Sequence, residues 1–255
     1  VKEIEDIKAQ LTAEGNSGSE MGMARILRVF IYSRLTDLHG DIPYSEAGQG
    51  YTNGILKPKY DAQKDIYMDF LKELEEAVAQ IGASTTMGAG DLIFQGNTTK
   101  WKAWGNSLML RFAMRLSKVD AVTSKAWAEK AVSAGTMTSN DHIAMIAHTD
   151  GPQGINKNGH GEVFDADGNP RMSKTFVDWL KDDPRLPILA ARRSDGSTAI
   201  ADLIGMPNGS TNVTVPDNSI YAEPNRKVIT KRDVPMVLQT YAEVRLMKAE
   251  MAQRG

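Results

Sequence analysis

The sequence predicts an all-α protein in which antiparallel helical hairpins carry one loop-rich insertion. Apolar residues recur at three- and four-residue steps in five separate segments, as the buried stripe of an amphipathic helix requires. Between residues 140 and 234 this periodicity weakens, while glycine and proline become frequent. We therefore expect one domain over residues 1–255, with helical hairpins at 20–135, the insertion at 140–234 and a further repeat helix at 235–255.

Each predicted helix has recognisable end signals. Gly40 and Gly135 follow apolar stripes and suit the left-handed backbone that ends a helix. Asp61, Asn97 and Thr98 precede stripes and are expected N-caps, because their side-chain oxygens can accept a hydrogen bond from a free backbone N–H. The long helices are expected at 21–38, 60–81, 101–116, 126–134 and 235–253, with a short one at 174–180.

Composition excludes several classes of function. The 30 basic and 32 acidic residues leave a net charge of −2, which gives no surplus of positive charge to hold nucleic acid. No run approaches the roughly 18 apolar residues of a membrane-spanning helix. The chain contains no cysteine, so disulfides, thiolate catalysis and cysteine-ligated zinc are excluded within it.

No metal or cofactor site is expected from the residue pattern. The segment from Asp165 to Asn169 resembles the start of a calcium-binding loop, but Pro170 stands where that loop needs glycine and Phe176 where it needs glutamate. A polar turn is the better interpretation, with bound calcium left open. The histidines lack the spacing of a zinc enzyme: His39, His142, His148 and His160.

Catalysis has no positive support either. The neighbouring acids Glu75 and Glu76, and likewise Asp182 and Asp183, point in different directions, so neither pair predicts a glycosidase. No glycine-rich phosphate loop or nucleophile elbow is present. We therefore expect a protein that is not an enzyme.

Five short segments follow one another in an order that is more specific than any single motif. They are Gly40-Asp41-Ile42-Pro43-Tyr44, then Pro58 to Tyr67, then Trp101 to Arg115 with its Asn106-Ser107-Leu108, then Asp183-Pro184-Arg185-Leu186, and finally Tyr241 to Glu250. In this order they resemble the SusD/RagB-like family of outer-membrane nutrient-binding lipoproteins. The likeness is closest to the SusD-like branch described as starch-binding associated with the outer membrane.

The resemblance implies a tetratricopeptide-like scaffold, an α/α superhelix, whose loop-rich excursion forms the ligand face. It implies a non-catalytic protein on the surface of the outer membrane. Its partner there would be a SusC-like TonB-dependent transporter. The family's signal peptide, lipidated cysteine and C-terminal portion are missing here, so we expect a piece of a longer protein that is anchored by a lipid upstream of Val1.

Several of the shared residues have structural interpretations. Trp101 and Trp104 lie on an apolar stripe and are expected in the core, not on a sugar. Arg111 and Arg115, one turn apart, are expected to pair with acidic residues of a neighbouring helix.

Ligand contacts are expected from aromatic and amide side chains in the loops. The C–H face of a sugar packs on an exposed ring, while asparagine bonds its hydroxyl groups. Tyr44, Tyr51 and Asn53 lie in the loop at 41–53, and Trp179 lies in the insertion. Trp179 follows Phe176 at a helical step of three, so a core position is the alternative for it.

The leading hypothesis is a non-enzymatic surface protein that captures an oligosaccharide and delivers it to a transporter. A peptide ligand is one alternative. A helical-repeat adaptor that binds only protein is another, and a glycoside hydrolase would need a pair of carboxyl groups in a cleft. The identity of the ligand depends on a few loop residues, to which the scaffold is indifferent.

Overall fold

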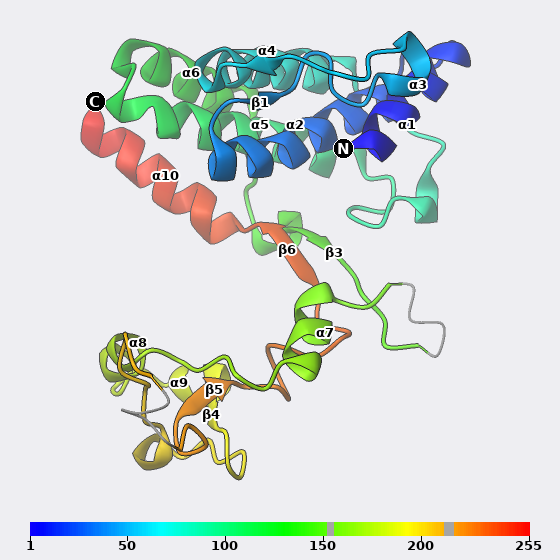
Figure 1. The fold of residues 1–255 in the computed structure, drawn as a ribbon. Helices are drawn as coiled ribbons and strands as arrows, with labels where there is room; N and C mark the ends of the chain where they lie inside the picture. The colour runs from blue at the N-terminus through cyan, green and yellow to red at the C-terminus, as the bar shows by residue number, and fades with distance from the viewer. Residues whose placement is uncertain (152–155, 212–216) are drawn as a thin grey trace. The chain divides into compact units, whose positions relative to one another are not determined.

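The computed structural model describes residues 1–151, 156–211 and 217–255, so two short stretches of the expected insertion lie outside the described residues. The described chain is mainly helical, as the sequence predicts (Figure 1). Its contacts divide it into two compact units. The helical unit comprises Val1–Met145 and Val237–Gly255, and the insertion unit comprises Ile146–Met236.

In the helical unit the long helices pack against one another in chain order. Helix α1 contacts α2, α2 contacts α4, α4 contacts α5, α5 contacts α6, and α10 returns to pack on α5. This succession of antiparallel neighbours is the hairpin array that the sequence predicts (Figure 1). The helices are α1 (Lys2–Ala13), α2 (Ser19–His39), α3 (Gly50–Asn53), α4 (Gln63–Gln80), α5 (Thr98–Arg115), α6 (Ala121–Ala134) and α10 (Tyr241–Arg254), with 3-10 turns at Gly88–Gly90, Leu116–Lys118 and Asn140–His142.

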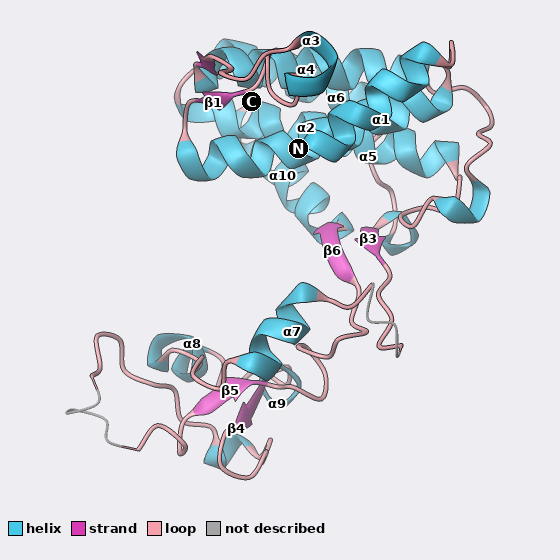
Figure 2. Ribbon diagram, turned by 45° about the vertical axis from the view of Figure 1, so that its right-hand side comes forward, coloured by secondary structure: helices cyan, strands magenta, loops and turns pink. Residues whose placement is uncertain are grey.

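Short elements make up the insertion unit, and every strand of the described chain is short (Figure 2). The sheets are two-stranded and pair β1 with β2, β3 with β6, and β4 with β5. Both β1–β2 and β4–β5 are antiparallel. The helices are α7 (Gly159–Ala166), α8 (Lys174–Trp179) and α9 (Leu186–Leu189), with a 3-10 turn at Ile200–Asp202. The strands of the described residues are β1 (Ile42–Pro43), β2 (Tyr60–Asp61), β3 (Ala144–Ile146), β4 (Ala190–Arg192), β5 (Ala222–Pro224) and β6 (Met236–Gln239).

Most predicted helix ends are confirmed. The Asn97 side chain caps α5 by accepting a hydrogen bond from the backbone N–H of Lys100 at 3.0 Å. Gly40 and Gly135 end α2 and α6 with φ of 74° and 98°. The N-cap of α4 is Ala62, so the prediction for Asp61 is wrong.

The fifth long helix begins later than predicted. Residues 236–239 form strand β6, and α10 begins at Tyr241. The Thr240 side chain caps α10 by accepting from the backbone N–H of Glu243 at 3.1 Å. The apolar residues before Thr240 therefore belong to a strand instead of the first turn of the helix.

The core of the helical unit lies between α2, α4 and α5. Trp101 and Trp104 are buried in it, as predicted, and Trp104 is fully buried. Gly22 of α2 lies so close to α4 that a Cβ there would be 2.7 Å from the carbonyl oxygen of Ala77. Glycine at this position therefore sets how closely the two helices approach. The largest fully buried side chains of the core are Trp104, Tyr32, Phe70, Phe112, Ile26 and Ile66.

Two arginines of α5 fasten neighbouring helices, as predicted. Arg111 pairs with Glu243 of α10, and Arg115 pairs with Asp37 of α2. These pairs connect α5 with α10, which follows the insertion, and with α2 of the first hairpin.

The insertion unit has its own small core. The buried side chains are those of Val177, Leu186, Ala190, Leu203 and Ala222. Beside this core the Glu223 carboxylate, which is nearly buried, is surrounded by three guanidinium groups. They belong to Arg226, Arg193 and Arg171, at 2.9, 3.5 and 3.9 Å. Ion pairs therefore supplement a core that contains few large apolar side chains.

Within the described ranges, no helix combines the length and the apolar content that crossing a membrane requires.

Candidate functional site

The loop between α2 and α4 carries three of the four residues predicted to contact ligand. Asp61 anchors its first part, because its carboxylate accepts hydrogen bonds from the backbone N–H groups of Tyr44 and Ser45 at 3.2 and 2.7 Å. The Ser45 hydroxyl also donates to this carboxylate. The Asp61 side chain thus binds the loop instead of capping α4.

Tyr44 is buried, with 5% of its surface exposed. Its ring packs edge-on against Tyr32 and Phe70, with centroids 5.0 and 5.6 Å apart. The Arg28 guanidinium lies 4.3 Å from the ring centroid and donates to the hydroxyl at 2.7 Å, and this hydroxyl donates to Asp69 at 2.5 Å. Burial raises the pKa of Tyr44. The ring is therefore a core ring with no face open for stacking on a sugar.

Tyr51 and Asn53 both lie on the short helix α3 and are exposed. The Tyr51 ring is 88% exposed, and the Lys2 ammonium of α1 lies 5.2 Å from its centroid. The Asn53 amide nitrogen donates to the side-chain oxygen of Gln49 at 2.8 Å. Its amide oxygen accepts no hydrogen bond from the residues that the structure describes, so it is open to a ligand.

Trp179 ends α8 in the insertion unit and is 85% exposed. Val177 is the fully buried residue of this helix, whereas Phe176 is 38% exposed. The core position considered for Trp179 is therefore wrong, and its ring is free to stack. Tyr51 and Asn53 belong to the helical unit, so the predicted contacts are divided between the two units.

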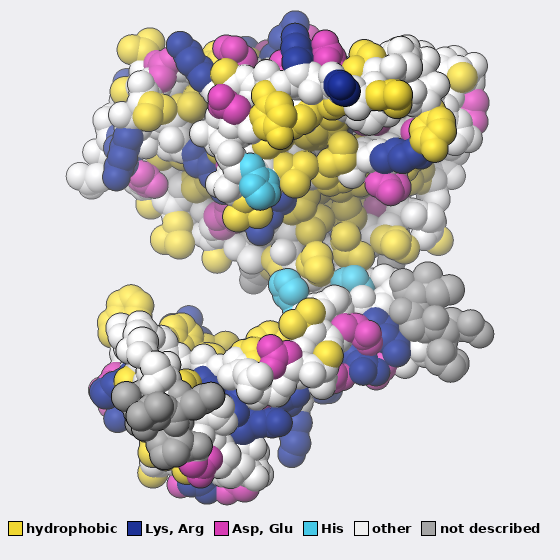
Figure 3. Space-filling view, viewed as in Figure 1, with side chains coloured by type: hydrophobic (Ala, Val, Ile, Leu, Met, Phe, Trp, Pro, Cys, Tyr) yellow, Lys and Arg dark blue, Asp and Glu magenta, His cyan; other side chains and the backbone are white. Residues whose placement is uncertain are grey.

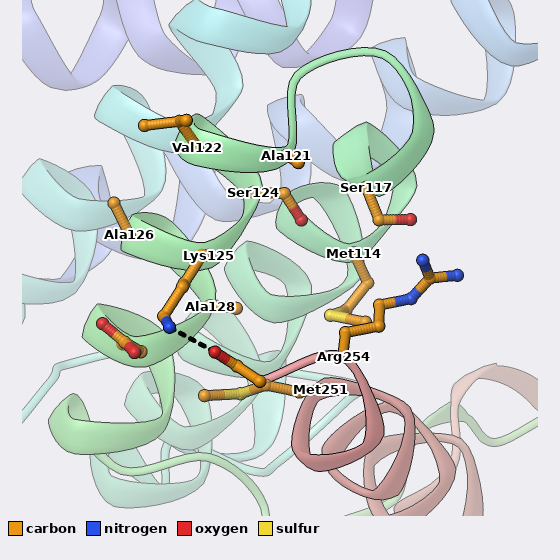
Figure 4. Close-up of a pocket in the computed structure, with 12 residues that line it drawn as sticks. Met114, Ser117, Ala121, Val122, Ser124, Lys125, Ala126, Ala128, Met251 and Arg254 are labelled. Carbon is orange, nitrogen blue, oxygen red and sulfur yellow. Dashed lines mark hydrogen bonds between the residues drawn. The ribbon is translucent and has the colours of Figure 1, made fainter.

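A cavity of about 640 Å³ lies elsewhere in the helical unit, between α5, α6 and α10. Figure 4 shows Met114 and Met251 among the side chains around it, with Lys125 bonded to the carbonyl oxygen of Gly255. Its surface is mainly hydrocarbon. A cavity with so few converging polar groups does not have the chemistry of a sugar site.

Other apolar side chains reach the surface of the helical unit. Figure 3 shows hydrophobic side chains gathered in the middle of its viewed face. On α2, Leu27 and Leu35 are partly buried against the core and Leu38 is 74% exposed. An apolar strip of this kind offers no hydroxyl or amide group to orient a sugar.

The acidic residues do not form a catalytic pair. Asp183 accepts hydrogen bonds from the side chain and the backbone of Arg185, which lower its pKa to about 2. A carboxyl group with this pKa is ionised at neutral pH and cannot act as a general acid. Glu75 pairs with Lys130 at 2.8 Å on the surface of the helical unit.

The calcium-like segment consists of the last two residues of α7 and the polar residues that follow the helix. Asp167 accepts from the backbone N–H of Asn169 at 2.9 Å, and Asp165 pairs with Arg232 at 2.7 Å. Among the described residues, no group of three or more histidines and acids is placed to hold a metal ion.

The comparison with protein families covers the whole chain. A family model of SusD-like proteins, described as starch-binding associating with the outer membrane, matches residues 1–255. The chain belongs to the SusD-like family. The resemblance found in the five sequence segments is therefore confirmed, and with it the tetratricopeptide-like fold. The family is associated with the outer membrane, and its members are binding proteins without catalytic activity.

Solved structures of other proteins support the same fold. A chitin-binding protein is 30% identical with a TM-score of 0.84, and the match covers 100% of this chain and 56% of that chain. A SusD homologue from Bacteroides vulgatus is 27% identical with a TM-score of 0.75, covering 93% of this chain and 48% of that one. A chitin-binding SusD homologue from Flavobacterium johnsoniae, at 24% identity and a TM-score of 0.80, covers 99% and 52% and shows the fold alone.

The chain thus spans about half the length of these solved relatives. A search among curated proteins gives no match.

Sequence reasoning missed one residue that organises the loop. Arg28 lies on the buried face of α2, one turn before Tyr32, and is 7% exposed. Its signal in the sequence is a charged residue among the apolar positions of a helix, which has to be paired inside the protein.

Proposed function

We propose that this SusD-like protein is a non-enzymatic surface protein that captures an oligosaccharide and delivers it to a SusC-like TonB-dependent transporter. The observation that carries the proposal is the family match over all 255 residues. A 30% identical protein of known structure is chitin-binding, which favours a glycan over a peptide. The delivery step and the transporter are implied by the family.

The exposed rings support a glycan ligand. Tyr51 and Trp179 present almost all of their surface to solvent, so both rings are accessible to a sugar. Stacking of a sugar on such a ring contributes on the order of 1 kcal/mol beyond the burial of area. The proposal retains Tyr51, Asn53 and Trp179 as ligand contacts and drops Tyr44.

The family description and one solved structure indicate which glycans we propose as ligands. The family description names starch, and the 30% identical structure binds chitin. Both polymers are neutral chains of pyranose rings that offer a C–H face and several hydroxyl groups. A peptide remains the second ligand class, because exposed rings and amides also suit an extended backbone.

Isothermal titration calorimetry tests the proposal with chitohexaose and maltoheptaose as glycan probes and a casein digest as the peptide probe. We expect a glycan probe to bind in the calorimeter. We expect no release of reducing sugar when the same mixture is assayed separately. Tyr51→Ala and Trp179→Ala should each weaken binding several-fold, whereas Leu246→Ala, which removes a 72% exposed apolar side chain of α10, should not. Sugar release would support the hydrolase instead. Binding of peptide alone would support the peptide ligand, and binding of none of the probes would leave the protein-only adaptor.

A further inference from the structure

A polar groove of about 360 Å³ lies between α1 and α3 in the helical unit. Pockets that bind small molecules occupy about 300–1,000 Å³, so the groove has room for one or two sugar rings. Neither wall belongs to the cavity of Figure 4. The walls are lined by Glu5, Lys8, Ala9 and Thr12 of α1, and by Gly48, Gln49, Thr52 and Asn53 of the α3 segment.

The two walls meet at a glycine. Gly48 has φ of +74°, and a Cβ there would lie 2.9 Å from the Cγ of Glu5. A side chain at position 48 would therefore strain the backbone and push α1 away from the loop. This close contact joins the α1 wall to the α3 segment.

A single buried guanidinium holds both walls. Arg28 donates from Nε to the Glu5 carboxylate of α1 at 2.6 Å. It also donates to the hydroxyl of Tyr44 at 2.7 Å and to its backbone carbonyl oxygen at 3.3 Å, in the loop that leads to α3. The Tyr32 hydroxyl donates to the same Glu5 carboxylate at 3.0 Å. The groove is therefore formed before any ligand arrives, which reduces the entropy cost of binding.

The lining of the groove offers open hydrogen-bonding groups and contains one acidic and one basic residue. The charged side chains that line it are Glu5 and Lys8, which lie 3.8 Å apart and have opposite charges. Gln49 is already engaged, because its amide nitrogen donates to the Ser45 carbonyl at 2.8 Å and its oxygen accepts from Asn53. Within the described chain, the Thr52 hydroxyl and the Asn53 amide oxygen keep hydrogen-bonding capacity.

The Lys8 ammonium is a third hydrogen-bonding group of the groove, a donor in addition to the Thr52 hydroxyl and the Asn53 amide oxygen. Among the described residues it forms a long ion pair with Glu5, whose carboxylate also accepts from Arg28 and Tyr32. The hydroxyl groups of a sugar both donate and accept, and therefore match an ammonium, a hydroxyl and an amide oxygen together. The exposed ring of Tyr51 lies on α3 next to Thr52 in the chain.

We propose that the groove between α1 and α3 binds one neutral pyranose unit of the captured oligosaccharide. Thr52, Asn53 and Lys8 bond its hydroxyl groups, and Arg28 is a positioning residue that keeps the two walls together. This proposal rests on the proposed glycan-binding function. It adds the position of a binding site, the residues that line it and the neutral charge of the ligand.

Calorimetry with chitohexaose and maltoheptaose tests the site through two exposed residues that are not needed for folding. Thr52→Val and Asn53→Ala should each weaken binding of the preferred probe about 3- to 10-fold, the effect of one lost hydrogen bond. Thr99→Val, at an exposed threonine of α5, is the matched control and should leave binding unchanged. Glucuronate oligomers should bind no better than the neutral probes.

A test of Arg28 as a positioning residue has to distinguish weaker ligand binding from a general loss of stability. Arg28→Lys should weaken binding at least as much as Thr52→Val, because a lysine cannot bond both walls. Glu243→Gln lowers the stability of the same unit at a distant ion pair and should leave affinity unchanged. Gly48→Ala provides a second test of the walls and should also weaken binding.

The outcomes separate the two proposals. If the wild type binds a glycan probe and Trp179→Ala weakens it, while the Thr52 and Asn53 variants bind as the wild type does, the groove proposal is wrong and the glycan function stands. Loss of binding in Arg28→Lys alone would overturn the groove as a ligand site. If the wild type binds neither probe, both proposals fail.

Discussion

The guanidinium of Arg111 on α5 donates hydrogen bonds to both carboxylate oxygens of Glu243 on α10, at 2.5 and 2.7 Å. The two residues are 132 positions apart in the chain. Arg111 also donates to the backbone carbonyl oxygen of Leu238, the last but one residue of β6. One arginine therefore fixes both the strand and the helix with which the chain re-enters the helical unit.

Glu243→Gln should destabilise the helical unit by roughly 1–3 kcal/mol, because it leaves the Arg111 guanidinium, whose side chain is 12% exposed, without a charged partner. Urea unfolding followed by circular dichroism measures the change. Glu250→Gln is the matched control, since its pair with Arg254 on the same helix is exposed, and it should change stability by less than about 0.5 kcal/mol. Equal effects of the two variants would contradict the fastening role of Arg111.

Gly22→Ala should destabilise the protein although alanine favours helices. The new Cβ would lie 2.7 Å from the Ala77 carbonyl oxygen and 2.7 Å from the Cγ1 of Ile81, so α2 and α4 have to separate. Overpacking of this kind costs about 1–3 kcal/mol, whereas alanine gains about 1 kcal/mol of helix propensity over glycine.

Thermal unfolding gives the comparison for this variant. Gly90→Ala is the control, because it has open space around its Cβ and no positive φ, and it should leave the melting temperature nearly unchanged. A melting temperature of Gly22→Ala at or above that of the wild type would show that the helices can separate at no cost.

We expect the folding stability of the protein to fall in acid as Glu20 becomes protonated. Hydrogen bonds from the Thr85 hydroxyl and the Thr86 backbone lower its pKa to about 2, from an ordinary value of 4.5. A carboxyl group whose pKa is lower in the folded state stabilises that state fully above pH 4.5, and this contribution disappears as the pH falls towards 2.

The unfolding free energy of Glu20→Gln, measured from pH 7 down to pH 2, tests this linkage. The variant should be less stable than the wild type at pH 7, and the difference should shrink below pH 4.5. A difference in unfolding free energy that stays constant with pH would mean that the hydrogen bonds from Thr85 and Thr86 do not stabilise the ionised form of Glu20.

Trp179→Ala should leave stability within about 0.5 kcal/mol of the wild type, since the ring is 85% exposed. Val177→Ala, two residues earlier on the same helix, should cost roughly 1–3 kcal/mol because Val177 is fully buried in the small core of the insertion unit. Proteolysis of the insertion at rising temperature compares the two variants. The reverse order would place Trp179 in the core after all.

The helices were predictable because their signals are local. The apolar stripe, the Asn97 cap and the glycines at 40 and 135 each act within one or two turns of the backbone. Strand β6 was missed because Met236-Val237-Leu238 is a short apolar run, and a short run fits a strand as well as the start of a helix. The cap at Thr240, three residues before Glu243, was the available sign that the helix begins there.

The candidate site was only partly predictable, since burial depends on residues far along the chain. Tyr44 occurs in a loop motif, and nothing near it indicates that Arg28, Phe70 and Asp69 enclose its side chain. The exposure of Trp179 was equally hidden, because the helical step from Phe176 fits either face of α8. The wall that α1 contributes to the groove requires a contact between Glu5 and Arg28 that no local pattern predicts.

The side chains of Tyr51, Thr52 and Asn53 on α3 are exposed to solvent and are absent from the core of the helical unit. Substitutions at these three positions therefore leave the core of the helical unit unchanged, which makes the segment suitable for engineering. A library randomised at these three positions, with Gly48 and Arg28 kept, should yield folded proteins with altered sugar preference, and selection against immobilised glycans could sort them without restabilising the scaffold.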